Sequence, residues 1–303
     1  MSDARSPDAM NWPKSIPFLA VHAVALAAPF LAPPTFRLVG LALAVYAVRM
    51  FAVTAGYHRY FSHRSYRTSR AFQLVLAVLG ATAAQKGPLW WAGHHRDHHR
   101  YSDLPGDVHS PLLRGFWWSH VGWILSTGSD VVKLDRVKDL ARFPELRVVD
   151  RLYLVPPIAL AAGLLAAGGW PALLWGFAVS TVLLWHGTFV INSLAHVIGR
   201  RRYATNDGSR NSFLLAVITF GEGWHNNHHH FQGSVNQGFF WWELDLTYYA
   251  LRGLAALGLV WDLRRPPESA RLAHRRPAED ALPPRQVSRP AGPPAPAVAP
   301  TEA

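Results

Sequence analysis

The stretch FRLVGLALAVYAVRMFAVTAGYHRYFSH, residues 36–63, decides the fold, because an apolar run leads directly into two histidines. Residues 36–57 are mostly apolar and long enough to cross the hydrocarbon core of a bilayer, which takes about 20 residues. His58 and His63 then follow without an intervening linker. This order predicts a membrane protein with a histidine site at the mouth of its helix bundle.

The composition of the whole chain agrees with a membrane protein. Half of the 303 residues are apolar, 13 are Trp, and only 16% are charged, against roughly 25% in soluble domains. The net charge of +11 comes from basic residues that flank apolar runs, which favours contact with anionic lipid headgroups over nucleic acid. The chain has no cysteine, so disulfides, Fe–S clusters and thiolate metal sites are excluded.

Apolar runs elsewhere predict further membrane helices. Four stretches are long enough to span a bilayer: 16–33, 36–57, 152–169 and 171–191. Within each pair only a few residues intervene, which predicts two tight helical hairpins. Two more runs, 71–84 and 212–221, are too short to cross and are expected to form buried or interfacial helices.

Basic residues then predict the orientation. With four crossings, the N-terminus, residues 58–151 and everything after residue 191 share one side, and nearly all Lys and Arg fall there. The positive-inside rule makes that side cytoplasmic, including both termini. We therefore expect an all-α, multi-pass integral membrane protein with four transmembrane helices in two hairpins under a cytoplasmic helical cap. Its expected divisions are a polar segment (1–15), the membrane domain (16–263) and a Pro-rich disordered tail (264–303).

Eight histidines in three clusters are the strongest chemical signal in the chain. They are His58 and His63 in HRYFSH, His95, His98 and His99 in HRDHH, and His225, His228 and His229 in HNNHH. The i, i+3, i+4 spacing of each trio lies on one helix face, so all three of its imidazoles are expected to converge. The pair five residues apart fits an α-helical face poorly and indicates a helix end where the chain turns.

The number and type of these side chains predict a two-metal site. Imidazole suits Zn, Cu, Fe and Ni, and eight or nine histidines give two ions about four nitrogens each. Soluble di-iron bundles use Glu ligands, whereas carboxylates are nearly absent from these clusters; an all-nitrogen di-iron centre fits, and so does zinc by ligand type. His196 follows Asn192 at i+4, which makes it a candidate ninth ligand with Asn192 in water-mediated contact. The mid-span His22 is expected to be a packing residue.

The clusters and their flanks resemble the membrane fatty-acid desaturases, in particular the Δ9 group that includes stearoyl-CoA desaturase. The resemblance covers residues 54–263 and rests on GYHRYFSHRSY, HRDHHRYSD, RGFWWSHVGW, TFVINSLAH and GEGWHNNHHHF. It implies a di-iron site bound by His58, His63, His95, His98, His99, His196, His225, His228 and His229, with Asn192 near one ion through water. It also implies that Gln85, Trp91 and Trp185 line a bent apolar tunnel; an interfacial or core position is the alternative for the two tryptophans.

The same resemblance implies the reaction. The expected activity is O2-dependent insertion of a cis double bond, at Δ9, into the saturated chain of a long-chain acyl-CoA or acyl-lipid. Two electrons would come from a separate donor of the ferredoxin, cytochrome b5 or reductase type, because no cytochrome-like domain is recognisable. Two departures weaken the acyl-CoA assignment: Gly93-His94 stand where animal acyl-CoA enzymes have Arg-Asp, and ILSTGSD replaces a basic pair after SHVGW. Lys86, Arg96 and Arg114 are candidates to compensate, and phospholipid or acyl carrier protein are alternative carriers.

Other functions remain as alternatives at this point. Hydroxylation, ketolation or acetylenation would use similar histidine clusters, and product analysis separates them from desaturation. A metal-ion transporter would place its ligands within spans near the bilayer midplane, whereas these clusters lie outside the expected spans. A haem protein needs two facing imidazoles per haem, which tight trios do not supply.

Overall fold

The computed structural model describes residues 6–275, and most of this part is helical. The helices of the membrane region and the first half of the cap are α1 (Trp12–Leu31), α2 (Phe36–Phe51), η1 (Ala52–Ser62), α3 (Arg70–Ala81), α4 (Pro88–Tyr101), α5 (Pro111–Arg114), η2 (Trp118–Gly122), α6 (Trp123–Leu125), η3 (Thr127–Asp130), η4 (Leu134–Arg136), α7 (Lys138–Ala141) and α8 (Pro144–Arg151). The later elements are α9 (Val155–Ala172), η5 (Leu173–Val179), α10 (Ser180–Asn192), η6 (Leu194–His196), α11 (Phe213–Ile218), α12 (His225–His230), α13 (Leu246–Ala256) and α14 (Glu268–Leu272). Strands β1 (Arg67–Thr68) and β2 (Val260–Trp261) pair antiparallel.

Three helical stretches are long and apolar enough to cross a membrane: Trp12–Leu31, Phe36–Ser62 and Val155–His196. The sequence predicts four spans because it divides the third stretch at its glycines. The structure has a break at that point, since Gly168 (φ −145°) and Gly169 (φ +64°) leave helical geometry inside α9, shortly before η5 begins. The positive φ of Gly169 is one that a residue without Cβ adopts at little cost.

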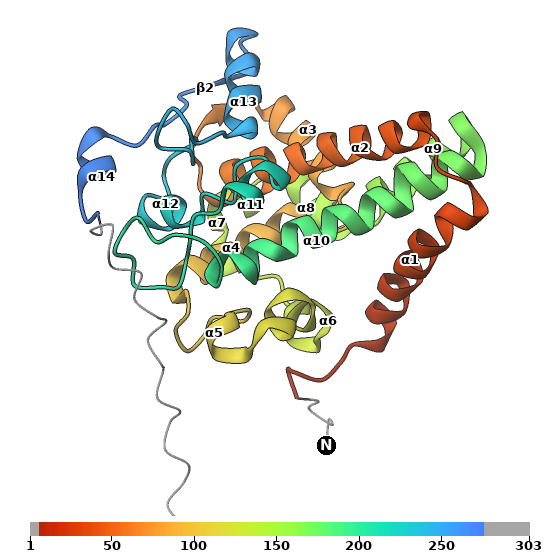
Figure 1. Cartoon of the computed structure of the whole chain (residues 1–303), viewed down its shortest axis with the longest axis horizontal. Helices are drawn as coiled ribbons and strands as arrows, with labels where there is room; N and C mark the ends of the chain where they lie inside the picture. Colours follow the sequence, from red (N-terminus) through yellow and green to blue (C-terminus); the bar gives the residue numbers. More distant parts are fainter. Residues whose placement is uncertain (1–5, 276–303) are drawn as a thin grey trace, which may run out of the picture.

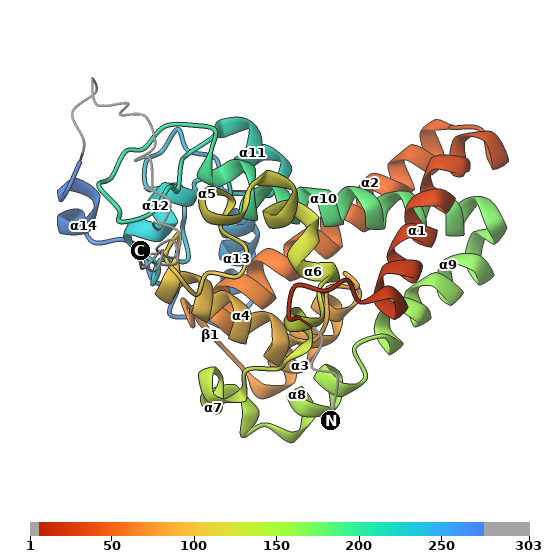
Figure 2. The same ribbon diagram turned by 90° about the horizontal axis from the view of Figure 1, so that it is seen from below.

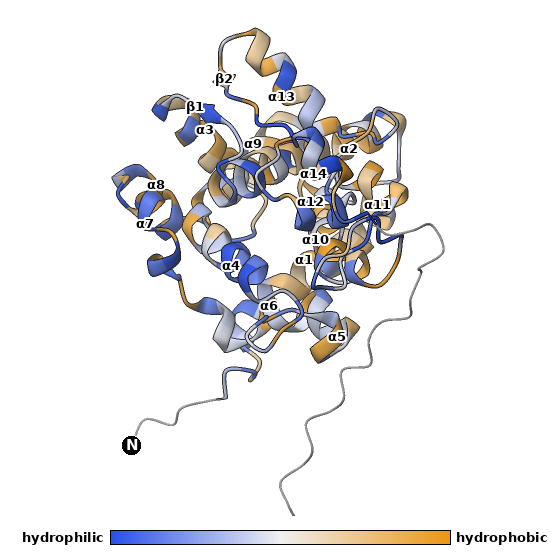
Figure 3. Ribbon diagram, turned by 90° about the vertical axis from the view of Figure 1, so that its left-hand side faces the viewer, coloured by the Kyte–Doolittle hydropathy of each residue, from blue (hydrophilic) through white to orange (hydrophobic). Residues whose placement is uncertain are grey.

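The long helices gather at one end of the molecule and the histidine-bearing elements at the other (Figure 1). Figure 2 shows α1, α2, α9 and α10 together, with α4, α12 and α14 on the opposite side. Figure 3 shows hydrophilic colouring on α4, α7 and α8 and hydrophobic colouring on α2 and α11. Inside the long-helix end, the buried Arg49 of α2 donates hydrogen bonds to Ser180 and Thr181 of α10 and to the carbonyl of Thr82.

A π-helix continues α2 into the histidine site. Residues Ala52–Ser62 form η1, in which hydrogen bonds link residues five apart, and the amide of His63 donates to the carbonyl of His58 at 3.2 Å. This winding places His58 and His63 on the same face, although their spacing fits an α-helix poorly. The chain also turns here as expected, since Arg64 has φ +51°.

Short helices complete the cap. The expected short runs form α3 and α11, and α3 begins at Ser69, whose hydroxyl accepts from the Phe72 amide. At the start of α4, the Asp150 carboxylate of α8 accepts the amides of Leu89 and Trp90, which satisfies donors that a helix N-terminus leaves free. This contact anchors the helix that carries His95, His98 and His99.

The expected tail begins with placed residues. Residues 264–275 include α14, and the Tyr203 hydroxyl donates to the carbonyl of Arg271 at 2.9 Å. The His230 ring is bonded to the carbonyl of Ala270. This first part of the expected disordered tail therefore contacts the cap, whereas residues 276–303, like residues 1–5, lie outside the described residues.

Candidate metal centre

Nine histidines from four parts of the chain meet inside the cap. Their ring nitrogens form two groups, and within each group the candidate ligand atoms lie within 4.8 Å of one another. The five-histidine group contains His58, His63, His95, His99 and His228, and the four-histidine group contains His98, His196, His225 and His229. All nine residues chosen from the sequence are therefore brought together, including His196.

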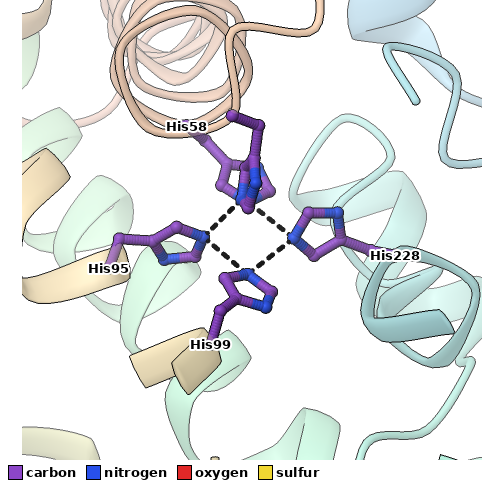
Figure 4. A group of neighbouring side chains, drawn as sticks. His58, His95, His99 and His228 are labelled. Atoms are coloured by element: carbon purple, nitrogen blue, oxygen red, sulfur yellow. Dashed lines mark hydrogen bonds between the residues drawn. The ribbon is translucent and has the colours of Figure 1, made fainter. Parts of the chain in front are cut away.

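In the five-histidine group the Nε2 atoms face a common centre. Figure 4 shows His58, His95, His99 and His228 turned toward one point. The Nε2 of His95 lies 2.8 Å from that of His63 and 2.9 Å from that of His99. The Nε2 of His228 lies 2.9 Å from that of His99 and 3.1 Å from that of His58.

These contacts cannot all be hydrogen bonds. A neutral imidazole nitrogen carries either one proton or one lone pair, so five converging Nε2 atoms form at most two good pairs. A cation at their centre would accept a lone pair from each. In the four-histidine group, Nε2 of His196 and His225 are 3.0 Å apart, and no described residue forms a hydrogen bond with the buried Nε2 of His229. Both groups therefore fit nitrogen-binding metal ions such as iron.

The trios do not each converge on one ion, which corrects the expectation from their spacing. On α4, His95 and His99 belong to the five-histidine group, whereas His98 belongs to the four-histidine group. On α12, His225 and His229 face the four-histidine group and His228 faces the other. Each helix thus lies between the two centres and contributes to both.

Four carboxylates hold the outer nitrogens of these rings. The Nδ1 atoms of His98, His196 and His229 lie 3.2, 2.9 and 2.6 Å from oxygens of Asp107, Asp103 and Asp207, respectively. In the five-histidine group, the Nδ1 of His58 lies 2.5 Å from Glu222. Such partners fix the ring orientation of a metal-binding histidine and raise its basicity.

Sequence reasoning did not assign these four carboxylates. Asp103 ends the quoted motif HRDHHRYSD, Asp107 follows it by four residues, and Glu222 belongs to GEGW, so proximity to the clusters was a usable signal. Glu222 also bonds the buried Arg59, which is bidentate to Asp245. This buried charge network joins η1 to the start of α13.

The protonation states suit metal binding, which requires neutral imidazoles. Burial, with the neighbouring imidazoles, lowers the pKa of His63, His95, His99, His225 and His228 well below its usual range. Burial alone would raise the pKa of Asp103, but hydrogen bonds from His196, Ser110 and the Gly208 amide bring it down to about 2. The pKa of Asp207 is also lowered, since the charge and hydrogen bond of His229 outweigh its burial.

An apolar cavity of about 520 Å³ leads to the five-histidine group. Its wall includes His95 and Asn192 as well as all three residues predicted to line a tunnel, Gln85, Trp91 and Trp185. The Gln85 amide donates to the Thr188 hydroxyl at 3.0 Å, and the Trp185 indole donates to the carbonyl of Ala83. Asn192 also lines the cavity, and its water-mediated contact with an ion stays a prediction.

Of the three basic residues considered as compensating, only Lys86 lines this cavity. Arg96 is bound to Asp139 and to the carbonyls of Phe61, Ser62 and Arg136. Arg114 pairs with Asp8 and lies over the Trp118 ring. Lys86 shares the Asp130 carboxylate with Lys14, which places two ammonium groups on one stretch of the cavity wall.

The mid-span His22 is part of a chain of rings. Its Nε2 lies 3.1 Å from Nε2 of His186, whose Nδ1 lies 2.9 Å from Nε2 of His120. The Nδ1 of His120 in turn lies 2.9 Å from the Ser193 hydroxyl. His22 and His186 therefore link α1, α10 and η2 and belong to neither metal group.

Comparison with known proteins identifies the family of this chain. The profile described as fatty acid desaturase matches residues 34–264. The chain is 38% identical over 257 residues to an sn-1 stearoyl-lipid 9-desaturase of Anabaena variabilis, covering 84% of this chain and 94% of the relative.

The names of two further relatives give double-bond positions other than Δ9. A chloroplastic palmitoyl-monogalactosyldiacylglycerol delta-7 desaturase of Arabidopsis thaliana is 38% identical, covering 83% of this chain and 68% of the relative. An icosanoyl-CoA 5-desaturase of Limnanthes douglasii is 36% identical, covering 84% of this chain and 72% of the relative. The chain belongs to the fatty acid desaturase family and is an oxidoreductase of that class.

Proposed function

We propose that this protein introduces a cis double bond at Δ9 into a saturated long-chain acyl group carried by lipid or by CoA, using O2 and two iron ions. The observation that supports it most is the apolar cavity, whose wall combines Gln85, Trp91 and Trp185 with His95 of the five-histidine group. A cavity of this kind presents an extended hydrocarbon chain to metal-binding nitrogens. The relatives named as 9-desaturases support the regiochemistry.

The two histidine groups would each hold one iron. Bound iron would supply the oxidising power that cleavage of an unactivated C–H bond requires. In the balanced reaction, two adjacent methylenes lose two hydrogens, and O2 is reduced to two waters with two further electrons and two protons from outside. The electrons would come from a separate donor protein.

The residues of this chain then position the substrate and exclude water. The rings of Phe18 and Trp185 stack at 4.9 Å, and both line the cavity. The bond between Gln85 and Thr188 ties α10 to the segment before α4. We propose that this part of the wall bends the acyl chain and fixes which carbons reach the metals, since small misplacements of a reacting group cost large factors in rate.

We also propose four membrane crossings with the cap in the cytoplasm. The break at Gly168 and Gly169 would divide the longest candidate span into two, with α9 entering and α10 returning. The cap then lies on the side that carries most Lys and Arg. Labelling of Trp170→Cys, beside the break, and of Arg252→Cys, in the cap, with a membrane-impermeant thiol reagent tests this topology. In intact cells we expect Trp170→Cys to be labelled and Arg252→Cys to be protected, and external labelling of Arg252→Cys would contradict the proposal.

Fatty-acid methyl-ester mass spectrometry with double-bond localisation tests the activity. A desaturase-deficient host would express the chain or its His95→Ala variant. A Δ9 monoene with the intact chain alone is the expected result, because His95 joins the cavity to the five-histidine group. A hydroxylated product, or equal monoene from the variant, would contradict the proposal. Assays of the purified protein with acyl-CoA and with acyl-lipid then separate the two carriers.

A further inference from the structure

A second cavity lies on the cap and shares no lining residue with the acyl cavity. It has a volume of about 450 Å³ and is lined by five arginines: Arg64, Arg67, Arg70, Arg142 and Arg264. We call it the arginine pocket. These residues come from the end of η1, from β1, from the start of α3, from the segment before α8 and from the segment after β2.

The carboxylates around the arginine pocket do not balance its charge. Arg70 is bidentate to Glu145, and Arg67 lies 3.2 Å from Asp262. Arg64 is 3.7 Å from Asp139. That carboxylate is already engaged by Arg96 at 2.7 and 3.1 Å.

The last two arginines carry the excess charge. Within residues 6–275, neither Arg142 nor Arg264 has a carboxylate within ion-pair distance, and Arg142 instead lies over the Phe143 ring. Both side chains are exposed, so water and salt screen much of their repulsion, and a doubly charged anion would be attracted to both. An anion bound between them would relieve this repulsion.

The floor of the pocket also has unused donors. Tyr60 and Gln73 are buried there, and the Tyr60 hydroxyl donates to Gln73 Oε1 at 2.9 Å. The Nε2 of Gln73 and the Nη1 of Arg64 are buried without a hydrogen-bond partner in the part of the chain that the structure describes. Unpaired buried donors carry a desolvation cost, which an acceptor oxygen would remove.

We propose that the arginine pocket is a phosphate-binding site, distinct from the acyl cavity, that takes a phosphate or phosphodiester group. Guanidinium forks match the oxygens of phosphate in bidentate geometry, and the pocket brings five of them together. The group could belong to a soluble phosphate or to an anionic lipid headgroup. Helix α3 begins at the pocket, and its exposed Leu74, Val75 and Val78 would contact a bilayer beside a headgroup bound there.

Calorimetry on the full-length protein in detergent, with inorganic pyrophosphate as the probe, tests the soluble source. We expect saturable binding that weakens with salt and falls at least about tenfold in Arg142→Gln/Arg264→Gln. The matched control is Arg37→Gln/Arg252→Gln, which removes the same charge from exposed positions outside the pocket. Equal affinity of the pocket variant and the wild type would overturn the soluble source.

Native mass spectrometry from nanodiscs tests the lipid source. We expect phosphatidylglycerol, and not phosphatidylcholine, to be retained by the wild type and the control and lost from the pocket variant. Equal retention by all three proteins would overturn the lipid source, and no binding in either experiment would overturn the site. Desaturation by the pocket variant should match the wild type, because no pocket residue lines the acyl cavity. Failure of the proposed activity is thereby distinguished from failure of this site.

Discussion

At the scale of single residues, carboxylates support the two histidine groups unequally. Three of the four rings in the four-histidine group contact an aspartate. Among the described residues, His58 is the one member of the five-histidine group with a carboxylate partner, and Glu222 shares its charge with Arg59. The buried Nδ1 atoms of His99 and His228 find no hydrogen-bond partner in residues 6–275. Added negative charge favours the more oxidised ion, so we expect the iron of the four-histidine group to have the lower reduction potential.

Asp207→Asn should weaken metal binding in the four-histidine group alone. The amide cannot supply the negative charge that lies 2.6 Å from the Nδ1 of His229, and loss of such a partner costs about 10- to 100-fold in metal affinity. Iron per chain, measured after competition with a chelator, should fall from about two toward one.

The matched control is Asp135→Asn, which alters an exposed carboxylate 3.6 Å from Arg136. Exposed pairs of this kind contribute little, so its iron content should equal that of the wild type. Full iron retention in Asp207→Asn would contradict a role of the aspartates in orienting ligands.

At the scale of elements, helical geometry explains why each trio is divided. Residues three and four positions along an α-helix lie on either side of the starting residue, about 100° apart from each other. His98 and His99 therefore point to different sides of α4, and His228 and His229 to different sides of α12. The π-helix η1 does the reverse, because its wider turn brings His58 and His63 onto one side.

Neighbouring histidines of α4 should therefore serve different ions. We expect His98→Ala and His99→Ala each to lose mainly one iron, and Mössbauer spectra of the two variants to lack different quadrupole doublets. His230→Ala on α12 is the control, because its ring bonds the Ala270 carbonyl and joins neither group. Loss of the same doublet from both α4 variants would show that the trio binds one ion.

At the scale of the whole molecule, the metal centre joins segments far apart in sequence. The histidines come from η1 and the residue after it, from α4, from η6 and from α12, and a cation would compensate the lone pairs that converge there. Metal bound only by the folded state adds to its stability. Removal of the metal should therefore destabilise the whole cap cooperatively.

Chelation should lower the thermal midpoint of the detergent-solubilised protein by at least about 5 °C, since about 1 kcal/mol shifts a chain of this size by 2–4 °C. Fe²⁺ should restore it, as followed by differential scanning fluorimetry. The double variant His98→Ala/His99→Ala should show a smaller response to the chelator. An unchanged midpoint after verified iron removal would contradict a structural contribution from the metals.

The acyl cavity is also a property of the whole molecule, since α1, α4, α6, α9 and α10 all line it. Ala161 of α9 is part of its wall, so Ala161→Phe should fill space and shift products toward shorter acyl chains. Gly163→Phe is the control, because Gly163 does not line the cavity and a Cβ added there meets no atom within 4 Å. Gas chromatography measures the chain lengths of the products. Identical chain-length profiles for the two variants would contradict the assignment of this cavity as the acyl site.

The sequence by itself predicted the family, the helical class and the histidines that meet in the cap. Apolar length and residue spacing are local properties, so 36–63 could be assigned as a span ending in His58 and His63 before any contact was known. Spacing from Asn192 made His196 a candidate ligand, and the family resemblance added Gln85, Trp91 and Trp185. The structure places His196 in the four-histidine group and the other three on the cavity wall.

Only the tertiary structure decided which histidine belongs to which group, because that depends on how α4 and α12 are rotated against each other. It also decided the partners of the rings, since Asp103 reaches His196 and Glu222 reaches His58 across long stretches of chain. The arginine pocket also depends on the tertiary structure, because Arg64 and Arg264 lie far apart in sequence and line one cavity only in the folded chain. Spacing along a chain fixes which face of one helix a residue occupies; it does not fix which other element lies against that face.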